Sequence, residues 1–209
     1  MMTEEWCRRI CIIAEGYEEK YYLERLKSFN VFNHPLVDVA SIKNAKGLPN
    51  VFALFQSIFN SGAYDLIVVF CDGDNNSKQF NELLNNINDE IFGGVDISHS
   101  VVIFVNPVTL QVVLSHFGDV TLTHKAKANN NEEVEKLTGI IGYKAKEQQI
   151  KDMVNMIKYG SYNEMKERIK RLSTNVNDIP STNYLELLEL LEGLDIDKVD
   201  ILIHLLRNG

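Results

Sequence analysis

One short segment, Leu66–Cys71, constrains the fold more than any other: it is apolar throughout and rich in β-branched residues. A strand of this kind is buried on both faces, as in parallel sheets that helices cover. Around it, strand-like and helix-like segments alternate with short connections, which predicts an α/β fold with a mostly parallel, Rossmann-like sheet flanked by helices. The expected strands are Arg8–Ala14, Val37–Ile42, Leu66–Cys71 and Val101–Val105, and the expected helices are Glu18–Phe29, Val51–Phe59, Lys78–Ile91 and Val108–Phe117.

The pattern changes from about Asp119, beyond which we find helical spacing and no convincing strand. We therefore predict an α/β core over residues 1–118 and a helical extension over residues 119–209. Between Leu185 and Leu206 the apolar residues outnumber those that one narrow helix stripe requires. Two interpretations stay open for this excess: the helices pack within the core, or they form a homodimer or bind a partner protein.

Composition and charge limit the class of protein. The chain is 45% hydrophobic and 24% charged, which is typical of a globular protein. No apolar run approaches the roughly 20 residues that span a bilayer, and Met1–Glu5 lacks the basic residues of a secretory signal, so we expect a cytoplasmic protein without membrane contact. The net charge of −8 argues against a generic polyanion binder. Residues 120–175 nevertheless hold 11 basic and 7 acidic side chains, which fits either a local nucleic-acid surface or a solvated helical face.

Acidic residues follow two of the expected strands. Glu15 comes directly after the first strand, and Asp72 and Asp74 come directly after the most buried one. If these strands are neighbours, the three carboxylates converge at the carboxyl edge of the sheet, where parallel α/β proteins place functional groups. Carboxylates this close repel one another unless a cation neutralises them, and hard oxygen ligands suit Mg²⁺ or Mn²⁺. Glu19, one helical turn beyond Glu15, is a fourth candidate, as a ligand or as the group that orients a bound water.

The segment Asp72–Asn76 has other possible interpretations. The segment opens like an EF-hand loop, but Ser77 and Leu83 occupy the positions that need Gly and Glu. A phosphatase with an Asp-x-Asp nucleophile would usually place the pair after its first strand rather than after the third. A strand–helix turn without chemistry stays open, because Asp, Gly and Asn are natural turn residues.

A strand that ends in Glu-Gly with further acids (Glu15–Glu19), followed by a strand that ends in Asp-x-Asp, resembles the TOPRIM domain of primases, topoisomerases and OLD-type nucleases. The segment Asn106–Phe117 is similar to an Asn-Pro…His-Phe segment of RloB-like proteins, small TOPRIM-type proteins associated with restriction loci and phage defence. This resemblance implies that Glu15, Asp72 and Asp74 bind Mg²⁺ for phosphodiester chemistry on DNA or RNA.

The chain departs from that pattern at two positions: Leu110 stands where RloB-like proteins carry an acid, and Glu18 where Thr is usual. Leu110 and the net charge favour a second hypothesis, a metal- or nucleotide-binding module that regulates a partner without cutting. For His116, a packed or capping role is the simpler interpretation.

In the nuclease hypothesis, the metal polarises the scissile phosphate and lowers the pKa of a bound water, while a lysine stabilises the charge that develops on the phosphoryl group. The candidates are Lys125, Lys127, Lys144 and Lys146. We prefer Lys144 and Lys146 because they lie at the entrance to an expected long helix.

Overall fold

A computed structural model describes residues 6–73 and 78–208 of the chain. They form a five-stranded sheet in the order β2-β1-β3-β4-β5, in which β1 to β4 are parallel and β5 is antiparallel to β4. The strands are β1 (Arg8–Ala14), β2 (Val37–Asn44), β3 (Leu66–Asp72), β4 (Val102–Asn106) and β5 (Ser181–Thr182). The α/β architecture with a mostly parallel sheet is therefore confirmed.

Helices connect and cover these strands. Those of the first part of the chain are α1 (Tyr17–Ser28), α2 (Val51–Ser61), α3 (Lys78–Asn86), α4 (Ser98–Val101) and α5 (Leu110–Leu114), with a π-helical turn, Ile87–Ile91, after α3. Those of the second part are α6 (Asn131–Thr138), α7 (Glu147–Met156), α8 (Tyr162–Ile169), α9 (Tyr184–Leu191) and α10 (Ile196–Asn208). Short 3₁₀ turns occupy Leu48–Asn50, Lys127–Asn130 and Tyr159–Ser161. Among the residues with described structure, no helix is long and apolar enough to cross a bilayer.

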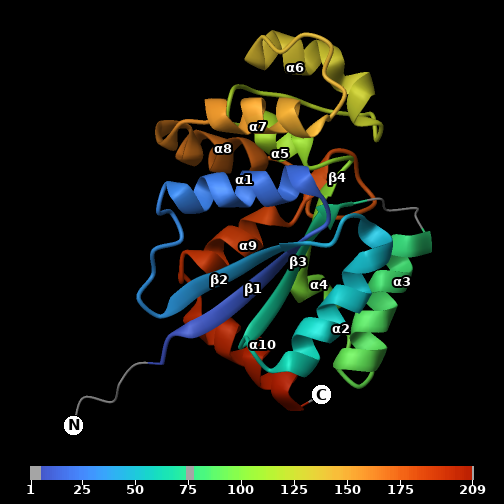
Figure 1. Cartoon of the computed structure of the whole chain (residues 1–209), viewed down its shortest axis with the longest axis vertical. Helices are drawn as coiled ribbons and strands as arrows, with labels where there is room; N and C mark the ends of the chain where they lie inside the picture. Colours follow the sequence, from blue (N-terminus) through green and yellow to red (C-terminus); the bar gives the residue numbers. More distant parts are fainter. Residues whose placement is uncertain (1–5, 74–77, 209) are drawn as a thin grey trace.

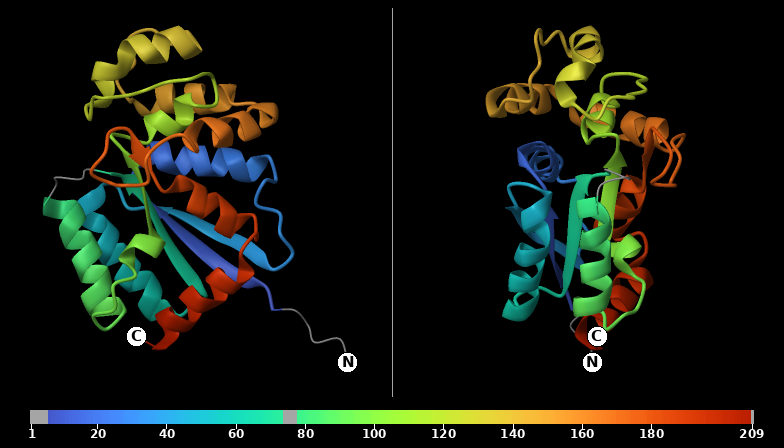
Figure 2. Two further views of the ribbon diagram at one scale, coloured as in Figure 1. Left: turned by 180° about the vertical axis from the view of Figure 1, so that it is seen from behind. Right: turned by 90° about the vertical axis from the view of Figure 1, so that its right-hand side faces the viewer.

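The sheet lies between helical layers, with α2 on one face and α9 and α10 on the other (Figures 1 and 2). The last five residues of β1, the first six of β3 and all of β4 are buried, as expected for central strands covered on both sides. Helices α5 to α8 gather beyond the carboxyl ends of the parallel strands, and α7 packs beside α1 (Figure 1). This upper layer covers the edge of the sheet at which we expect functional groups.

The second part of the chain contributes to the sheet itself. We predicted no strand beyond residue 119, and β5 corrects that prediction: Ser181 and Thr182 pair with Asn106 and Val105 at the end of β4. A strand of two residues is too short to show an alternating pattern, so the sequence gives no sign of it. The division at residue 118 stays a prediction, although α9 and α10 pack on the same sheet as the first part.

The Asn-Pro…His-Phe segment is built into this core. The side-chain amide of Asn106 donates hydrogen bonds to the backbone oxygens of Val176 (2.9 Å) and Asp178 (2.8 Å), and so fastens the loop before β5. His116 is buried, with Nε2 2.9 Å from the Tyr22 hydroxyl and Nδ1 2.8 Å from Ser161 Oγ. Burial, with the charge of nearby Arg168, lowers the pKa of His116 to about 3, so the ring is neutral at physiological pH. These contacts fit the packed role expected for His116.

Candidate metal centre

The first prediction for the site concerns two neighbouring strands. β1 and β3 are adjacent and parallel, with Ala14 opposite Phe70. Because the chains run side by side to the same edge, the backbone N–H of Asp72 donates a hydrogen bond of 3.0 Å to Glu15 Oε2. The structure therefore brings Glu15 and Asp72 together, as predicted. Asp74, the third predicted ligand, lies outside the described residues.

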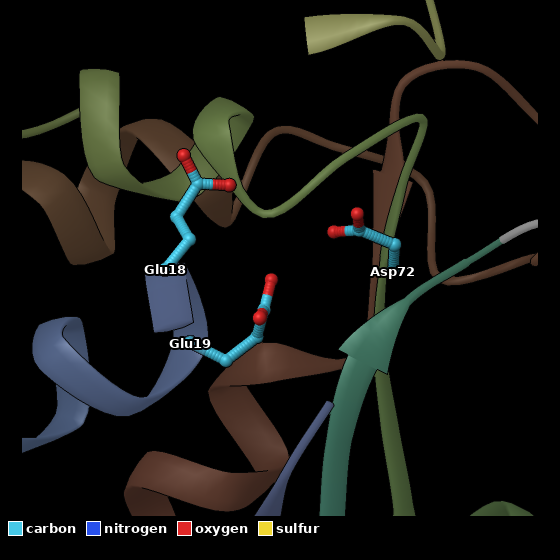
Figure 3. A group of neighbouring side chains, drawn as sticks. All are labelled: Glu18, Glu19 and Asp72. Atoms are coloured by element: carbon cyan, nitrogen blue, oxygen red, sulfur yellow. The ribbon is translucent and has the colours of Figure 1, made fainter. Parts of the chain in front are cut away.

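Three carboxylates converge just beyond this edge. Glu18, Glu19 and Asp72 each offer an oxygen, and these three oxygens lie within 4.8 Å of one another. Figure 3 shows the side chains of Glu18 and Glu19 rising from the first turn of α1, and that of Asp72 reaching toward them from the end of β3. Glu18 and Glu19 are 1% and 2% exposed, so this is a buried acidic cluster rather than a solvated patch. We call Glu18, Glu19 and Asp72 the acidic cluster.

Each member of the cluster is held through one oxygen. Glu18 Oε1 accepts a hydrogen bond of 2.7 Å from the Tyr143 hydroxyl, and Glu19 Oε2 accepts one of 2.9 Å from the N–H of Gly16. Asp72 Oδ1 accepts two, from the N–H (2.6 Å) and the hydroxyl (2.8 Å) of Thr109. These contacts fix the orientation of the carboxylates and leave the second oxygen of each one for a cation.

The second oxygens meet the ammonium group of Lys127. Its Nζ lies 2.6 Å from Glu18 Oε2, 3.2 Å from Asp72 Oδ2 and 3.6 Å from Glu19 Oε1. Glu18 Oε2 and Glu19 Oε1 are buried, so their contacts with the Lys127 ammonium group compensate for lost solvation. Lys127 belonged to the predicted set of candidate lysines but was not the preferred member.

The electrostatics follow from this crowding. Burial, together with the charges of Asp72 and Glu19, raises the pKa of Glu15 to about 8. Burial also raises the pKa of Glu19 to about 7, against the opposing effect of Lys127. Burial alone would lower the pKa of Lys127, but Asp72, Glu18 and Glu19 raise it well above its ordinary value. Burial and the crowding of carboxylates therefore favour the neutral forms of Glu15 and Glu19, despite the ammonium group of Lys127.

A small pocket of about 180 Å³ opens beside the cluster. Its lining includes Glu15, Asp72, Pro107 and Lys125. It gives a solute a route to the carboxyl edge of β1 and β3, next to the acidic cluster.

The residues present fit a hard divalent cation. The donor set consists of carboxylate oxygens, which Mg²⁺ and Mn²⁺ prefer, and two of those oxygens, Glu18 Oε2 and Glu19 Oε1, are buried and already meet a cation, the Lys127 ammonium group. The acidic cluster can therefore hold a metal ion. It differs from the predicted set in that Glu18 joins Glu19 and Asp72, while Glu15 contacts the backbone of Asp72 instead of the centre.

The preferred lysines lie elsewhere. Lys144 and Lys146 are exposed, and Lys146 directly precedes α7. The cation that meets the carboxylates is Lys127, from the 3₁₀ turn before α6. Sequence reasoning missed Glu18 because it treated this residue only as a departure from the family pattern. The available signal was the pair Glu18-Glu19 two residues after Gly16, which places both acids in the first turn of a helix.

Comparisons with known protein families, with curated proteins and with solved structures give no match. The resemblance to TOPRIM and RloB-like proteins therefore stays a prediction from the sequence motifs. The geometry of the site is the basis on which a function can be inferred.

Proposed function

We propose that this chain is a metal-dependent phosphodiesterase that cleaves nucleic acid, a TOPRIM-type nuclease of the RloB-like kind with a role in phage defence. One observation carries the proposal: two buried carboxylates from the first turn of α1 and a partly buried one from the end of β3 direct oxygens to a common centre beside a pocket. Buried carboxylates at this spacing are costly unless a cation stabilises them. Such sites are therefore typical of function rather than of structural stability.

Glu18, Glu19 and Asp72 would hold the ion, Mg²⁺ or Mn²⁺. When bound, that ion supplies Lewis-acid polarisation of a phosphate oxygen. Around it, Thr109 orients Asp72 through two hydrogen bonds, and the N–H of Gly16 orients Glu19. Glu15 lines the same pocket, where burial raises its pKa in the metal-free protein, and it would serve there as a general acid that gives a proton to the leaving oxygen.

The basic residues of the second part of the chain support a polyanionic substrate. Lys125 lines the pocket, next to Asp72. Lys144 and Lys146 are exposed and lie just before α7, a helix of the layer beyond the carboxyl ends of the strands (Figure 1), so they can contact a phosphate backbone. In this role they position the substrate instead of acting on the reacting phosphate.

The test is cleavage of labelled single- and double-stranded DNA and RNA in the presence of Mg²⁺ or Mn²⁺, with Asp72→Asn as the test variant. Asp38→Asn, an exposed aspartate on β2, is the matched control. We expect metal-dependent products from the wild type and from Asp38→Asn, and a loss of at least about 100-fold for Asp72→Asn. The proposal is wrong if the purified wild type cleaves none of these substrates with either metal.

Two observations favour a second candidate, a module that binds a metal or nucleotide and regulates a partner without cutting. An ammonium group already sits among the carboxylates, and Leu110, where the family pattern has an acid, is fully buried and adds no ligand. Mn²⁺ binding by calorimetry, lost in Asp72→Asn but without turnover on any nucleic acid, would select this candidate.

The C-terminal helices α9 and α10 are the candidate surface for association with another protein chain. Most apolar side chains of α9 and α10 are buried in the core, which favours packing within the chain. Ile201 of α10 is an exception, exposed at 61%, and Leu194, which lies between the two helices, is exposed at 68%. Association through this surface, as a homodimer or with a partner protein, stays a prediction that light scattering of the intact chain tests.

A further inference from the structure

Lys127 reaches the acidic cluster from an exposed segment. His124, Lys125, Ala126, Ala128 and Asn129 are exposed, whereas the side chain of Lys127 turns inward and is 23% exposed. Before the segment, the N–H of Leu122 donates to Oε1 of Gln111 in α5 (2.8 Å). Within the segment, the side-chain amide of the buried Asn130 donates to the backbone oxygen of His124 (3.0 Å).

The Lys127 ammonium occupies the place that a divalent ion needs. It contacts Glu18 Oε2, Asp72 Oδ2 and Glu19 Oε1, the oxygens left over after each carboxylate has made its protein hydrogen bonds. Its distances to them, 2.6 to 3.6 Å, are those of an ammonium group and exceed the roughly 2.1 Å of a Mg²⁺–oxygen bond. A divalent ion bound to the same oxygens would lie within the volume that Nζ now fills.

Two cations in that volume would repel each other, so the two states exclude one another. The charges favour exchange, because the ammonium group of Lys127 faces three carboxylates. A divalent ion brings twice the charge to the same oxygens. The residues around Lys127 are exposed, so its side chain can withdraw to the surface while the hydrogen bond between Leu122 and Gln111 stays in place.

We infer that Lys127 is an internal competitor for the metal site: a divalent ion binds Glu18, Glu19 and Asp72 by expelling the Lys127 ammonium to the surface, beside the pocket. This inference deepens the proposed function and depends on the metal centre that it assumes. Metal binding then exposes a lysine at the point where a phosphate enters. The apparent metal affinity is lowered by the fraction of molecules in which Lys127 fills the site.

The first experiment measures the reactivity of Lys127 in the wild-type protein. Amine acetylation followed by mass spectrometry compares the peptide that contains Lys127 in excess EDTA and in saturating Mn²⁺, with the exposed Lys136 as internal reference. We expect Lys127 to be protected in EDTA and at least about tenfold more reactive with Mn²⁺. Lys136 should react equally in both. Unchanged protection of Lys127 in a protein that binds Mn²⁺ overturns the inference and leaves the metal centre standing.

The second experiment removes the competitor. Lys127→Met keeps the length of the side chain without its charge, and Lys136→Met is the matched control. Calorimetric titration with Mn²⁺ should show binding at least about tenfold tighter for Lys127→Met than for the wild type, which corresponds to a metal-competent state populated to roughly one tenth in the wild type. Equal or weaker binding by Lys127→Met overturns the inference. If neither protein binds Mn²⁺, the metal centre is overturned as well. Tighter binding by Lys127→Met without nuclease activity supports the inference and contradicts only the proposal that the chain is a nuclease.

Discussion

The substitution Lys127→Met also has a large predicted effect on stability when no metal is present. Lys127 is the cation that faces Glu18, Glu19 and Asp72, two of which are almost fully buried. Removal of one partner from a buried ion pair typically costs 3–5 kcal/mol, because the remaining charge is left without compensation. The Lys127 side chain is 23% exposed, so we take the lower end, about 3 kcal/mol at pH 8. For a chain of 209 residues this corresponds to a fall in Tm of about 6–12 °C.

The same substitution should cost much less at pH 5. There the buried glutamates take up protons in the variant, and neutral carboxyl groups need no cation. The measurement is calorimetric or urea unfolding in EDTA at both pH values, with Lys136→Met expected within about 0.5 kcal/mol of the wild type. Addition of Glu18→Gln to Lys127→Met should recover part of the loss, with a coupling of at least about 1 kcal/mol. The reasoning is refuted if Lys127→Met is as stable as the wild type at pH 8, or if it loses the same free energy of unfolding at pH 5 as at pH 8.

Three more predictions concern the metal centre and the C-terminal helices. In EDTA, the free energy of unfolding of the wild type should fall as the pH rises from about 4.5 to 8. The reason is that Glu15 and Glu19 keep their protons in the folded protein up to about pH 8 and 7, whereas the unfolded chain releases them near 4.5. A free energy of unfolding that rises over this range in urea titrations contradicts this. Thr109→Val removes one of the two hydrogen bonds to Asp72 Oδ1 and should weaken Mn²⁺ binding about tenfold in calorimetry; unchanged affinity would mean that Thr109 does not orient the ligand. Truncation after Asp178 removes β5, α9 and α10 from the sheet and should abolish cooperative unfolding; a truncated chain that unfolds as sharply as the intact one would contradict this.

The main strands and the meeting of Glu15 with Asp72 could be predicted from the sequence. Leu66–Cys71 is so uniformly apolar that only a strand covered on both faces accommodates it, and the alternation with helices then requires parallel neighbours. Parallel strands end at the same edge, which places residues 57 positions apart in contact without any knowledge of side-chain geometry.

The composition of the acidic cluster could not be predicted in the same way. Whether Glu15, Glu18 or Glu19 reaches the centre depends on the residue at which α1 begins, and a shift of one residue turns a side chain by about 100°. Lys127 comes from an exposed segment with no periodicity, so nothing in the sequence distinguished it from Lys125, Lys144 or Lys146. Lys127 reaches the acidic cluster because the second part of the chain folds over the carboxyl edge of the sheet.

The central claim is that Glu18, Glu19 and Asp72 form a divalent-metal site. The most direct test is a crystal structure of the wild-type protein grown in Mn²⁺, with anomalous scattering recorded at the manganese edge. We predict one strong peak bonded to an oxygen from each of the three carboxylates, with the Lys127 ammonium withdrawn from the centre. An electron-density map with Lys127 still paired to Glu18 and Asp72, and no anomalous peak among the carboxylates, would contradict the account.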